Sequence, residues 1–439
     1  MLQIYMKYIF FFTLILLKSL NSYSQLEHAN KFAKTITEKD LKKHLYIYAS
    51  DEFEGRNTGS KGQKKAVEYL RNFYIQNDIK PGDPDKDYFQ KMTLNISRGN
   101  EGKVDSENVI AIIEGTEKPD EYLILTAHLD HVGYGRTGSR LRTSYVGEIK
   151  DRIHNGADDD GSGTVAMLEI AQAFKQASKK GKGPKRSIIF LHVTGEEKGL
   201  LGSAYYSDNP IYPLSKTVAN LNLDMIGRID PTRKGDKREY IYIIGSDHDS
   251  QDLHNISEQT NLQTVNIDLD YRYNAKDDPQ RFYYRSDHYN FAKKGIPIIF
   301  YFSGTHEDYH LPSDTPDKIN YDLLELRSKL IFYTAWNIAN RDKRVIVDPK
   351  PESEIFEIDS DKLETYAGKY STEGVPLVID IYVRNDKLFI EVMNQSLELT
   401  PVAEDKFKIE AASLDLTFDT DGGTMQFKQG PYQIKLKRE

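Results

Sequence analysis

The sequence predicts an α/β fold in which a mixed, mostly parallel sheet lies between helix layers, followed by a small all-β domain at the C-terminus. Between about residues 108 and 302, apolar runs of five to eight residues alternate with helical or loop segments. This pattern is typical of a sheet that is buried on both faces. After about residue 360 the apolar segments are short and alternating, and turn residues such as Asn385 and Asp386 separate them. These later segments are typical of antiparallel strands.

Length and composition indicate a soluble globular protein with two folded units. The chain has 439 residues, of which 38% are hydrophobic and 29% are charged. This length exceeds that of one ordinary domain and allows a large α/β domain and a smaller unit. We expect a signal peptide over residues 1–24, the α/β domain over 25–342, a linker over 343–360 and a small β-barrel-like domain over 361–439.

The first 24 residues have the layout of a cleaved secretory signal. Lys7 precedes an apolar run from Tyr8 to Leu17, and small residues follow, which predicts cleavage after Ser24. This run of ten residues is too short to span about 30 Å of hydrocarbon, so we expect no membrane contact after cleavage. Because the chain contains no cysteine, disulfides and a cysteine-linked lipid are both excluded. Export without disulfides favours a bacterial protein that is periplasmic or extracellular.

The chain is acidic, with a formal net charge of -8. Loss of Lys7 and Lys18 with the signal, and of no acidic residue, would change this charge from -8 to -10. The basic cluster from Lys179 to Arg186 is short and glycine-rich, which is typical of a solvated loop. We therefore expect no nucleic-acid partner.

The predicted elements of the α/β domain follow in chain order. Two helical stretches lie between residues 37 and 78, and the apolar runs NVIAIIEG and EYLILTAH come next. These two runs are separated by TEKPD and are expected to form an antiparallel hairpin at one side of the sheet. The later runs are RSIIFLHVTG, TVANLNLDMIG, EYIYIIGS and IPIIFYFSG. The apolar spacing from Tyr321 to Asn340 predicts a helix that closes the domain.

Acidic and imidazole side chains occur at or just past the carboxyl ends of these predicted strands, where open α/β sheets bind ligands. His128 ends the second run, and Asp130 follows it on the same side of the strand. Because a carboxylate usually holds the second nitrogen of a metal-binding imidazole, Asp130 is a candidate partner of His128. Asp224 ends an otherwise apolar strand, where a carboxylate without a partner is costly.

Two acidic clusters add to this set. Asp158, Asp159 and Asp160 precede a predicted helix, and three adjacent carboxylates repel one another unless a cation neutralises them. Asp and Ser also cap helices, which is the alternative interpretation of this segment. Glu196 and Glu197 end the strand RSIIFLHVTG. One of two such neighbours can hold a metal while the other accepts a proton from metal-bound water.

A second imidazole, His310, lies just past the last predicted strand. The candidate ligands offer nitrogen and oxygen but no thiolate, a set that suits two Zn²⁺ ions with a shared carboxylate, and Mn²⁺ or Co²⁺ could replace them. Two ions about 3.5–4 Å apart can hold one hydroxide and stabilise a tetrahedral oxyanion. The candidate metal ligands are His128, Asp159, Glu197, Asp224 and His310.

Six motifs, in this order, resemble the M28 family of zinc metallopeptidases, which includes bacterial leucine aminopeptidases. They are HLDHVG, NGADDDGSG, TGEEKGLLGS, NLDMIGR, RSDHYNFAKKGIPIIF and YHLPSDT. The resemblance extends from about residue 45 to about residue 340 and implies a zinc-exopeptidase-like fold. It implies that His128 and Asp224 hold one zinc ion. Glu197 and His310 would hold the other.

The resemblance also implies roles for further residues of these motifs. Asp159 would bridge the two ions, and Glu196 would take a proton from the bridging water and pass it to the leaving amine. Tyr309 would stabilise the oxyanion, and a packed tyrosine is the alternative. Asp287 and His288 are expected to be structural. Arg285 could read a substrate carboxylate, although a structural ion pair is its expected role.

These residues predict an exported two-zinc aminopeptidase that acts on peptides with a free N-terminus, through a metal-bridged hydroxide and Glu196 as base. Glutaminyl cyclisation, or a carboxypeptidase-type cut on the same scaffold, is the alternative. Glutaminyl cyclases resemble this fold but usually hold one metal ion. A non-catalytic binding protein is disfavoured, because all five ligand candidates and Glu196 are present.

Overall fold

The computed structural model describes most of the chain from residue 26 onward. The described ranges are 26–83, 87–96, 102–134, 153–234, 237–349, 356, 358–392, 395–409, 412, 414–429 and 432–439. The predicted signal peptide, residues 1–24, lies outside them. The chain divides into two compact units, with the boundary between Asp348 and Pro349.

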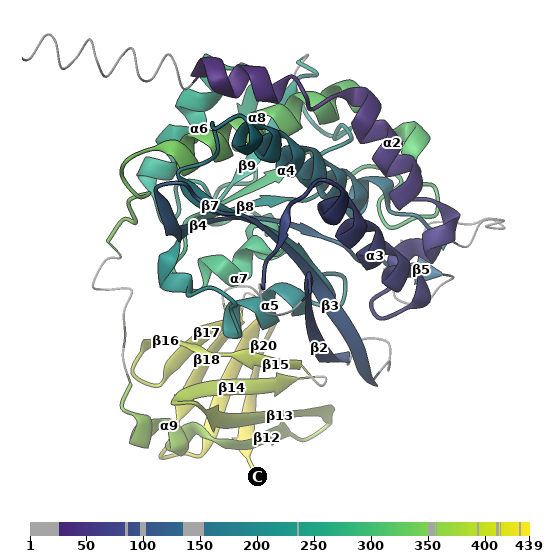
Figure 1. Ribbon diagram of the computed structural model, residues 1–439. Helices are drawn as coiled ribbons and strands as arrows, with labels where there is room; N and C mark the ends of the chain where they lie inside the picture. Colours follow the sequence, from purple (N-terminus) through teal and green to yellow (C-terminus); the bar gives the residue numbers. More distant parts are fainter. Residues whose placement is uncertain are drawn as a thin grey trace, which may run out of the picture. The chain divides into compact units, whose positions relative to one another are not determined.

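A mixed sheet forms the centre of the first unit (Figure 1). Its strands are β1 (Lys80–Pro81), β2 (Phe89–Ile96), β3 (Gly102–Ile113), β4 (Lys118–His128), β7 (Arg186–Val193), β8 (Thr217–Leu223), β9 (Tyr240–Ile244), β10 (Asp268–Asp270) and β11 (Ile298–Phe302). They lie in the order β1-β3-β7-β4-β8-β11-β9-β10, and β2 pairs with β3. The central strands β7, β4, β8 and β11 are parallel. Strand β3 runs antiparallel to β7, and β9 runs antiparallel to β11. The predicted mixed sheet is confirmed, and its parallel pairs are concentrated at its centre.

Helices cover both faces of this sheet, as predicted. They are α2 (Glu38–Tyr48), α3 (Lys61–Gln76), α4 (Gly163–Lys179), α5 (Leu201–Asp208), α6 (Gln251–Gln263), α7 (His288–Ala292) and α8 (Tyr321–Asn340). Figure 1 shows α4, α6 and α8 on one face and α5 and α7 on the other. The alternation along β4 explains these layers, because Leu123 and Leu125 pack in one core with Phe174 of α4. Ile124 packs in a separate core with Tyr206 of α5.

Helix α8 has the predicted bounds, and one of its side chains forms hydrogen bonds with the segment that follows β8. Arg327 of α8 is fully buried, and its guanidinium donates to the carbonyls of Ile226 at 2.7 Å and Arg228 at 2.8 Å. It also donates to the carbonyl of Tyr240 in β9 at 2.8 Å. A buried guanidinium with several acceptors fixes loop backbone that has no strand partner. The chain just past Asp224 is therefore held by a helix from the end of the unit.

The predicted hairpin of the first two apolar runs is wrong. Strands β3 and β4 do run in opposite directions, but β7 lies between them, antiparallel to β3 and parallel to β4. The connection crosses the start of β7, where the amide of Thr116 donates to Pro184 O at 3.0 Å. Two strand spacings amount to only about 9.6 Å, which four extended residues can span. A short connection therefore does not require its two strands to pair.

The second unit consists of helix α9 (Ser360–Tyr366) and one antiparallel sheet. The strands are β12 (Gly368–Thr372), β13 (Val375–Arg384), β14 (Lys387–Val392), β15 (Gln395–Glu398), β16 (Thr400–Ala403), β17 (Lys406–Ile409), β18 (Leu414–Asp419), β19 (Thr424–Gln429) and β20 (Tyr432–Arg438). Their order is β15-β14-β13-β12-β20-β19-β18-β17-β16. The two end strands, β15 and β16, are separated only by Leu399, whose amide donates to Leu388 O at 2.8 Å. The sheet is therefore nearly closed, and the predicted small all-β domain is confirmed.

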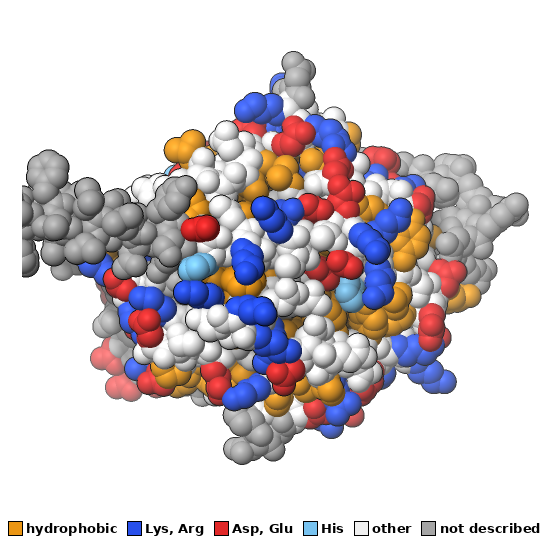
Figure 2. All heavy atoms as spheres, turned by 45° about the horizontal axis from the view of Figure 1, so that its top comes forward, with side chains coloured by type: hydrophobic (Ala, Val, Ile, Leu, Met, Phe, Trp, Pro, Cys, Tyr) orange, Lys and Arg blue, Asp and Glu red, His pale blue; other side chains and the backbone are white. Residues whose placement is uncertain are grey.

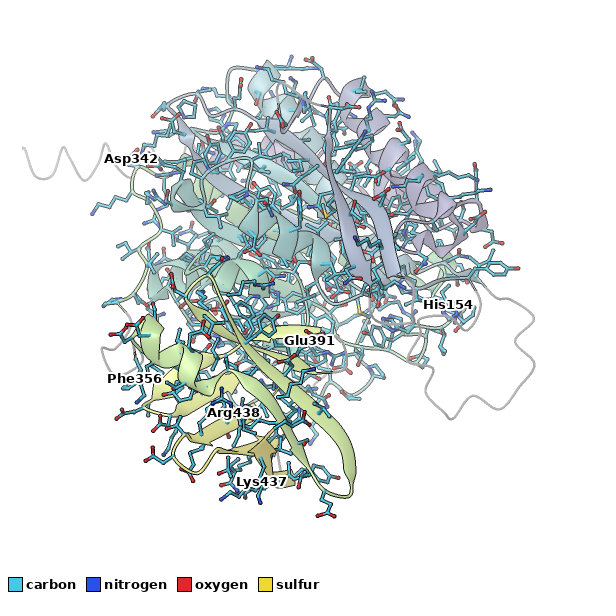
Figure 3. The ribbon with its side chains drawn as sticks, turned by 90° about the horizontal axis from the view of Figure 1, so that it is seen from below. His154, Asp342, Phe356, Glu391, Lys437 and Arg438 are labelled. Carbon is cyan, nitrogen blue, oxygen red and sulfur yellow. The ribbon has the colours of Figure 1, made fainter. Side chains whose placement is uncertain are left out.

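The chain closes this sheet by returning to its first strand. The last strand, β20, pairs with β12 through Arg438 and Lys437, which are labelled in Figure 3. Alternate residues of the strands, such as Ile379, Ile381 and Leu436, are buried in one apolar core. Alternating burial is the pattern that an antiparallel sheet with one solvated face requires.

One face of the molecule mixes both signs of charge. On the face drawn in Figure 2, acidic and basic side chains are interspersed with small apolar areas. Among the described residues, no helix has the length and the apolar character needed to cross a membrane.

Candidate metal centre

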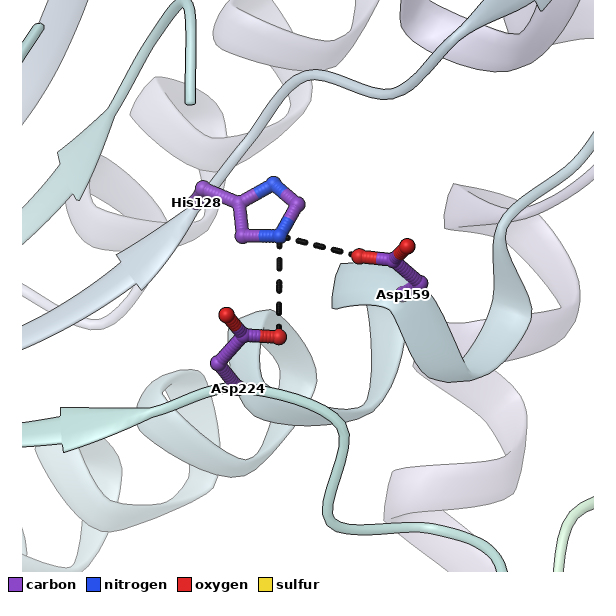
Figure 4. Close-up of side chains that lie close together, drawn as sticks. All are labelled: His128, Asp159 and Asp224. Atoms are coloured by element: carbon purple, nitrogen blue, oxygen red, sulfur yellow. Dashed lines mark ion pairs between the residues drawn. The ribbon is translucent and has the colours of Figure 1, made fainter. Parts of the chain in front are cut away.

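The carboxyl edge of the central parallel strands brings all five predicted metal ligands together. His128 is the last residue of β4, and Asp224 directly follows β8. His128 Nε2 lies 3.0 Å from Asp159 Oδ1 and 3.7 Å from Asp224 Oδ1 (Figure 4). We call His128, Asp159 and Asp224 the first ligand group. These three side chains are buried, and their ligand atoms lie within 4.8 Å of one another.

A second ligand group lies on the other side of Asp159. His310 Nε2 lies 2.9 Å from Asp159 Oδ2 and 3.1 Å from Glu197 Oε1. A third imidazole joins them, because His131 Nδ1 lies 2.9 Å from Glu197 Oε1 and 3.8 Å from Asp159 Oδ2. The second ligand group therefore consists of Asp159, Glu197, His310 and His131. The two oxygens of Asp159 face different groups, so this carboxylate is shared.

The acidic triplet divides into one residue that faces the site and two that hold the backbone. Asp160 accepts from the amides of His128 at 3.0 Å and Met225 at 3.2 Å. Asp158 accepts from the amide of Gly227 at 2.6 Å. Backbone N–H donors thus stabilise the outer two carboxylates. Of the three aspartates, only Asp159 faces both ligand groups. The peptide bond between Asp159 and Asp160 is cis.

A chain of buried side chains orients Asp224. Ser286 Oγ donates to Asp224 Oδ2 at 2.6 Å, and the side-chain Nδ2 of Asn222 donates to Ser286 Oγ at 2.8 Å. Asn222 Oδ1 in turn accepts from Thr126 of β4 at 2.6 Å. Ligating carboxylates are commonly fixed by such partners. The residue Ser286 was not among the predicted site residues, although it lies in the motif RSDHYNF.

Asp130 connects the first ligand group to the glutamate pair. The nitrogen Nδ1 of His128 lies 3.0 Å from the backbone carbonyl of Asp130, whereas the Asp130 carboxylate is 4.0 Å away. That carboxylate accepts from Thr58 Oγ1 at 2.8 Å and from the amide of Glu196 at 3.1 Å. The carbonyl therefore holds the His128 ring. The carboxylate positions the backbone of Glu196, a role that we did not predict for it.

His310 is placed by its backbone. It lies in the loop after β11 with a left-handed φ of 58°, and its carbonyl is 3.1 Å from Nδ1 of His154, which Figure 3 labels. The ring of Tyr309 stacks on the His310 ring with a centroid distance of 3.9 Å. Tyr309 also packs against the aromatic cluster around Phe282 and Phe300. Both the packing and the site-facing interpretations of Tyr309 are therefore compatible with its position.

The residues after Ser286 are buried below the centre. Asp287 Oδ1 accepts from Ser203 Oγ at 2.5 Å, and burial raises the pKa of Asp287 to about 7. His288 Nε2 lies 2.8 Å from Tyr283 O, and burial lowers the pKa of His288 to about 3. Arg285 is exposed, with its guanidinium 4.6 Å from the centre of the Phe282 ring. Arg285 forms no ion pair with another described residue, so the structural ion pair that we expected for it is not found there.

Electrostatics within the second ligand group favour the charged forms of His310 and Glu197. Burial opposes the charged form of His310, but Glu197 and Asp159 outweigh it and raise the pKa of His310 to about 10. Burial likewise opposes ionisation of Glu197, whereas the charge of His310 helps to lower the pKa of Glu197 to about 2. The two ligand groups together place three imidazoles and three carboxylates close to one another, an arrangement that a cation-binding site also has.

A metal ion fits these contacts. His128 Nε2 and Asp159 Oδ2 are buried and form no hydrogen bond with any described residue, which is costly unless another partner is present. A tetrahedral zinc ion with bonds of about 2.0–2.1 Å separates its ligand atoms by about 3.3 Å. The observed contacts of 2.9 to 3.8 Å in the two groups are close to that spacing. The set of nitrogen and oxygen donors suits Zn²⁺.

Two curated relatives are similar to parts of the chain. It is 37% identical over 119 residues to "Probable glutamate carboxypeptidase LAMP1" of Arabidopsis thaliana, which covers 27% of the chain and 14% of the relative. It is 26% identical over 248 residues to "Aminopeptidase YwaD" of Bacillus subtilis, which covers 54% of the chain and 46% of the relative. The chain thus spans less than half of the length of each of these two relatives.

Solved structures share the fold of a large part of the chain. The LapA aminopeptidase of Legionella pneumophila superposes with a TM-score of 0.53 at 20% identity and covers 72% of this chain and 75% of its own. The glutaminyl cyclase of Porphyromonas gingivalis has the same TM-score and identity and covers 68% of this chain and 97% of its own. At this level of identity the comparison establishes fold. The family model described as "Peptidase family M28" matches residues 108–335, which include both ligand groups, and the chain belongs to this family.

Proposed function

We propose that the protein is a two-zinc aminopeptidase that removes N-terminal residues from peptides. The observation that carries this proposal is the position of Asp159, with Oδ1 3.0 Å from His128 Nε2 and Oδ2 2.9 Å from His310 Nε2. A carboxylate placed in this way can bridge two ions about 3.5–4 Å apart, as in two-metal aminopeptidases. The similarity to aminopeptidase YwaD supports the choice of reaction.

Each ligand group would hold one ion. His128 and Asp224 would bind the first ion and Glu197 and His310 the second, with Asp159 between them. When bound, the two ions polarise the scissile carbonyl and lower the pKa of the attacking water. Ser286 keeps Asp224 in place, and Asp130 keeps the backbone beside Glu197 in place.

Glu196 would be the general base. Burial raises the pKa of Glu196 well above the usual carboxyl value, and Glu197 and Asp224 add to this shift while His128 opposes it. A carboxylate with a raised pKa accepts the proton of the attacking water more readily and can return it to the leaving amine. Burial also raises the pKa of Tyr309 well above that of a free phenol. Its hydroxyl would therefore stay protonated and donate to the oxyanion.

The amino end of the peptide would enter the centre, as the similarity to aminopeptidase YwaD suggests. The exposed guanidinium of Arg285 is available for a substrate carboxylate, which would favour short peptides. An assay therefore has to compare peptides that differ in the free N-terminus with peptides that differ in the C-terminal carboxylate.

The test uses one zinc-loaded preparation and four matched peptides. They are a peptide with N-terminal leucine, its N-acetyl form, its C-terminally amidated form and the same peptide with N-terminal glutamine. We expect free leucine from the first and third peptides, no leucine from the acetylated peptide, and loss of all release with chelator. A carboxypeptidase-type enzyme would instead spare the amidated peptide, and a glutaminyl cyclase would form pyroglutamate and ammonia. Either of these results would reject the proposed reaction.

We also propose that the protein is exported from a bacterial cell. The support is the signal-like layout of residues 1–24 and the absence of cysteine from the chain. N-terminal sequencing of the protein from fractionated cells tests this proposal. We expect a mature chain that begins near Gln25 in the periplasm or medium, and an intact Met1 in the cytosolic fraction would contradict it.

A further inference from the structure

His131 is held next to the second ligand group by its own backbone and by a glycine. Its amide donates to Arg56 O at 3.2 Å, and it forms a parallel bridge with Asn57. Gly156, with a φ of 54°, packs directly on the His131 ring, so that a Cβ there would lie 2.6 Å from ring carbons. The ring position therefore depends on the loop that carries Asp159.

The contacts of His131 Nδ1 resemble those of the predicted ligands. This nitrogen lies 2.9 Å from Glu197 Oε1 and 3.8 Å from Asp159 Oδ2. His310 Nε2 lies 3.1 and 2.9 Å from the same two oxygens, so both nitrogens contact Glu197 closely and His131 lies farther from Asp159. The two imidazole rings meet edge to face, with an interplanar angle of 76° and centroids 5.6 Å apart. Two nitrogens thus approach one pair of carboxylate oxygens from different directions.

A hydrogen bond does not explain the approach of His131 to Glu197. The side chain is fully buried, and neither ring nitrogen forms a hydrogen bond within the described ranges, despite the 2.9 Å contact. The Nδ1 position therefore lacks the alignment that an N–H donor needs. His128 Nε2 has the same combination of a 3.0 Å contact, burial and no hydrogen bond. A nitrogen directed at an ion between the ligands produces this combination.

We propose that His131 Nδ1 is a fourth protein ligand of the ion held by Asp159, Glu197 and His310, an inference that rests on the proposed two-metal site. The second ligand group then supplies four donors, whereas the first group supplies three. A fourth protein ligand adds to the affinity of a zinc site, and a group with three protein ligands keeps a free position for water or substrate. The second ion is therefore bound more tightly, and the first group keeps the open position.

The experiment measures Co²⁺ binding by the full chain, without substrate. An Asp224→Asn background weakens the first group, so that titration of the metal-free protein reports mainly the second group. Two substitutions are compared in this background, His131→Ala and His131→Asn. Asparagine keeps an amide donor near the position of Nδ1, and it would preserve a role that depends on a hydrogen bond to Glu197. Circular dichroism checks the fold of each variant, and His131→Asn carries the test if His131→Ala does not fold.

The expected result is that both substitutions raise the Kd for Co²⁺ more than about 100-fold, beyond the 10–100-fold typical of residues that only orient a ligand. The visible absorption of the bound Co²⁺ should also change. His192→Asn is the matched control, because His192 is buried in β7 and its Nε2 contacts Tyr74 at 2.7 Å. This control should leave the Kd unchanged. A smaller increase for the His131 variants, or recovery of affinity in His131→Asn, would overturn the inference.

Failure of this inference is distinguishable from failure of the proposed function. If His131→Asn binds Co²⁺ like the parent while the native protein releases N-terminal residues, only the role of His131 is wrong. If the native protein binds Co²⁺ through His131 but hydrolyses no peptide, only the reaction is wrong.

Discussion

The two ligand groups share Asp159 but are built in different ways. In the first group, His128 and Asp224 lie at the ends of neighbouring parallel strands, and hydrogen bonds from Ser286 and to Asp160 fix them. The second group comes from loops, with His310 in a left-handed conformation. Its members contact each other closely but depend on distant backbone for their positions. The sheet therefore positions one half of the centre, whereas packing between loops positions the other.

The largest effect on metal binding and hydrolysis is expected for a substitution of Asp159, which both ligand groups share. Asp159→Asn removes the negative charge that both groups share, so we expect both ions to bind weakly. Because a metal pair contributes several kcal/mol to catalysis, peptide hydrolysis should fall by about 10³-fold or more. Metal analysis after dialysis and kcat/KM on a leucyl peptide check this. Retention of two ions with nearly normal turnover would show that the two groups do not depend on Asp159.

A second change should separate proton transfer from metal binding. Glu196→Gln keeps the size of the side chain but removes its basicity, so kcat should fall by about 10² to 10⁴-fold. The zinc content should equal that of the unmodified protein, because Glu196 belongs to neither ligand group. Normal turnover would reject the role of Glu196, and loss of zinc would assign it to the metal site instead.

The metal affinity of the first ligand group should depend on Ser286, the hydrogen-bond donor to Asp224. Ser286→Ala removes the donor that lies 2.6 Å from Asp224 Oδ2, and such partners typically contribute about 10–100-fold to metal affinity. Competition with a chelator measures the change. Ser246→Ala is a matched control, because Ser246 is buried and its Oγ contacts His254 Nδ1 at 2.9 Å, away from the centre. Equal effects of the two substitutions would mean that Ser286 has no specific role.

The last expected effect is on the stability of the metal-free protein, and it belongs to the second group. In the metal-free protein the pKa of His310 is raised to about 10, above the usual value of about 6.5. The stabilisation is therefore fully present below about pH 6.5 and is lost as pH rises toward 10, by at most about 1.4 kcal/mol per pH unit. The Tm of the metal-free protein should fall across this window, and His310→Gln should reduce the slope. Parallel curves for the two proteins would contradict this assignment.

Strand-level features could be predicted because they depend on local sequence. The apolar runs that become β4, β7, β8 and β11 are short and bounded by turn residues, and helix α8 has the predicted bounds Tyr321–Asn340. The pairing of β3 could not be predicted in the same way, because a four-residue connection can reach either a neighbouring strand or the next one. Strand order depends on which faces the helices cover, and this is a property of the whole unit.

The centre shows the same division between local and distant determinants. His128 and Asp224 could be predicted because polar residues at the ends of apolar strands are unusual and point to one edge of the sheet. His131 was missed, although its spacing of three residues from His128 in HLDHVG was visible. Past the strand end, the direction of a side chain is fixed by contacts such as that with Gly156, which lies far away in the sequence. The positions of Ser286 and Asp130 relative to their partners likewise depend on long-range hydrogen bonds.

The most direct test of the central claim is a zinc titration of the metal-free protein during hydrolysis of a leucyl peptide. If two ions share Asp159 and both are required, activity should be low until the tighter site is filled and should become maximal at two equivalents of Zn²⁺ per chain. The N-acetylated peptide should remain uncleaved throughout. Full activity at one equivalent, or hydrolysis that does not depend on added Zn²⁺, would contradict the account.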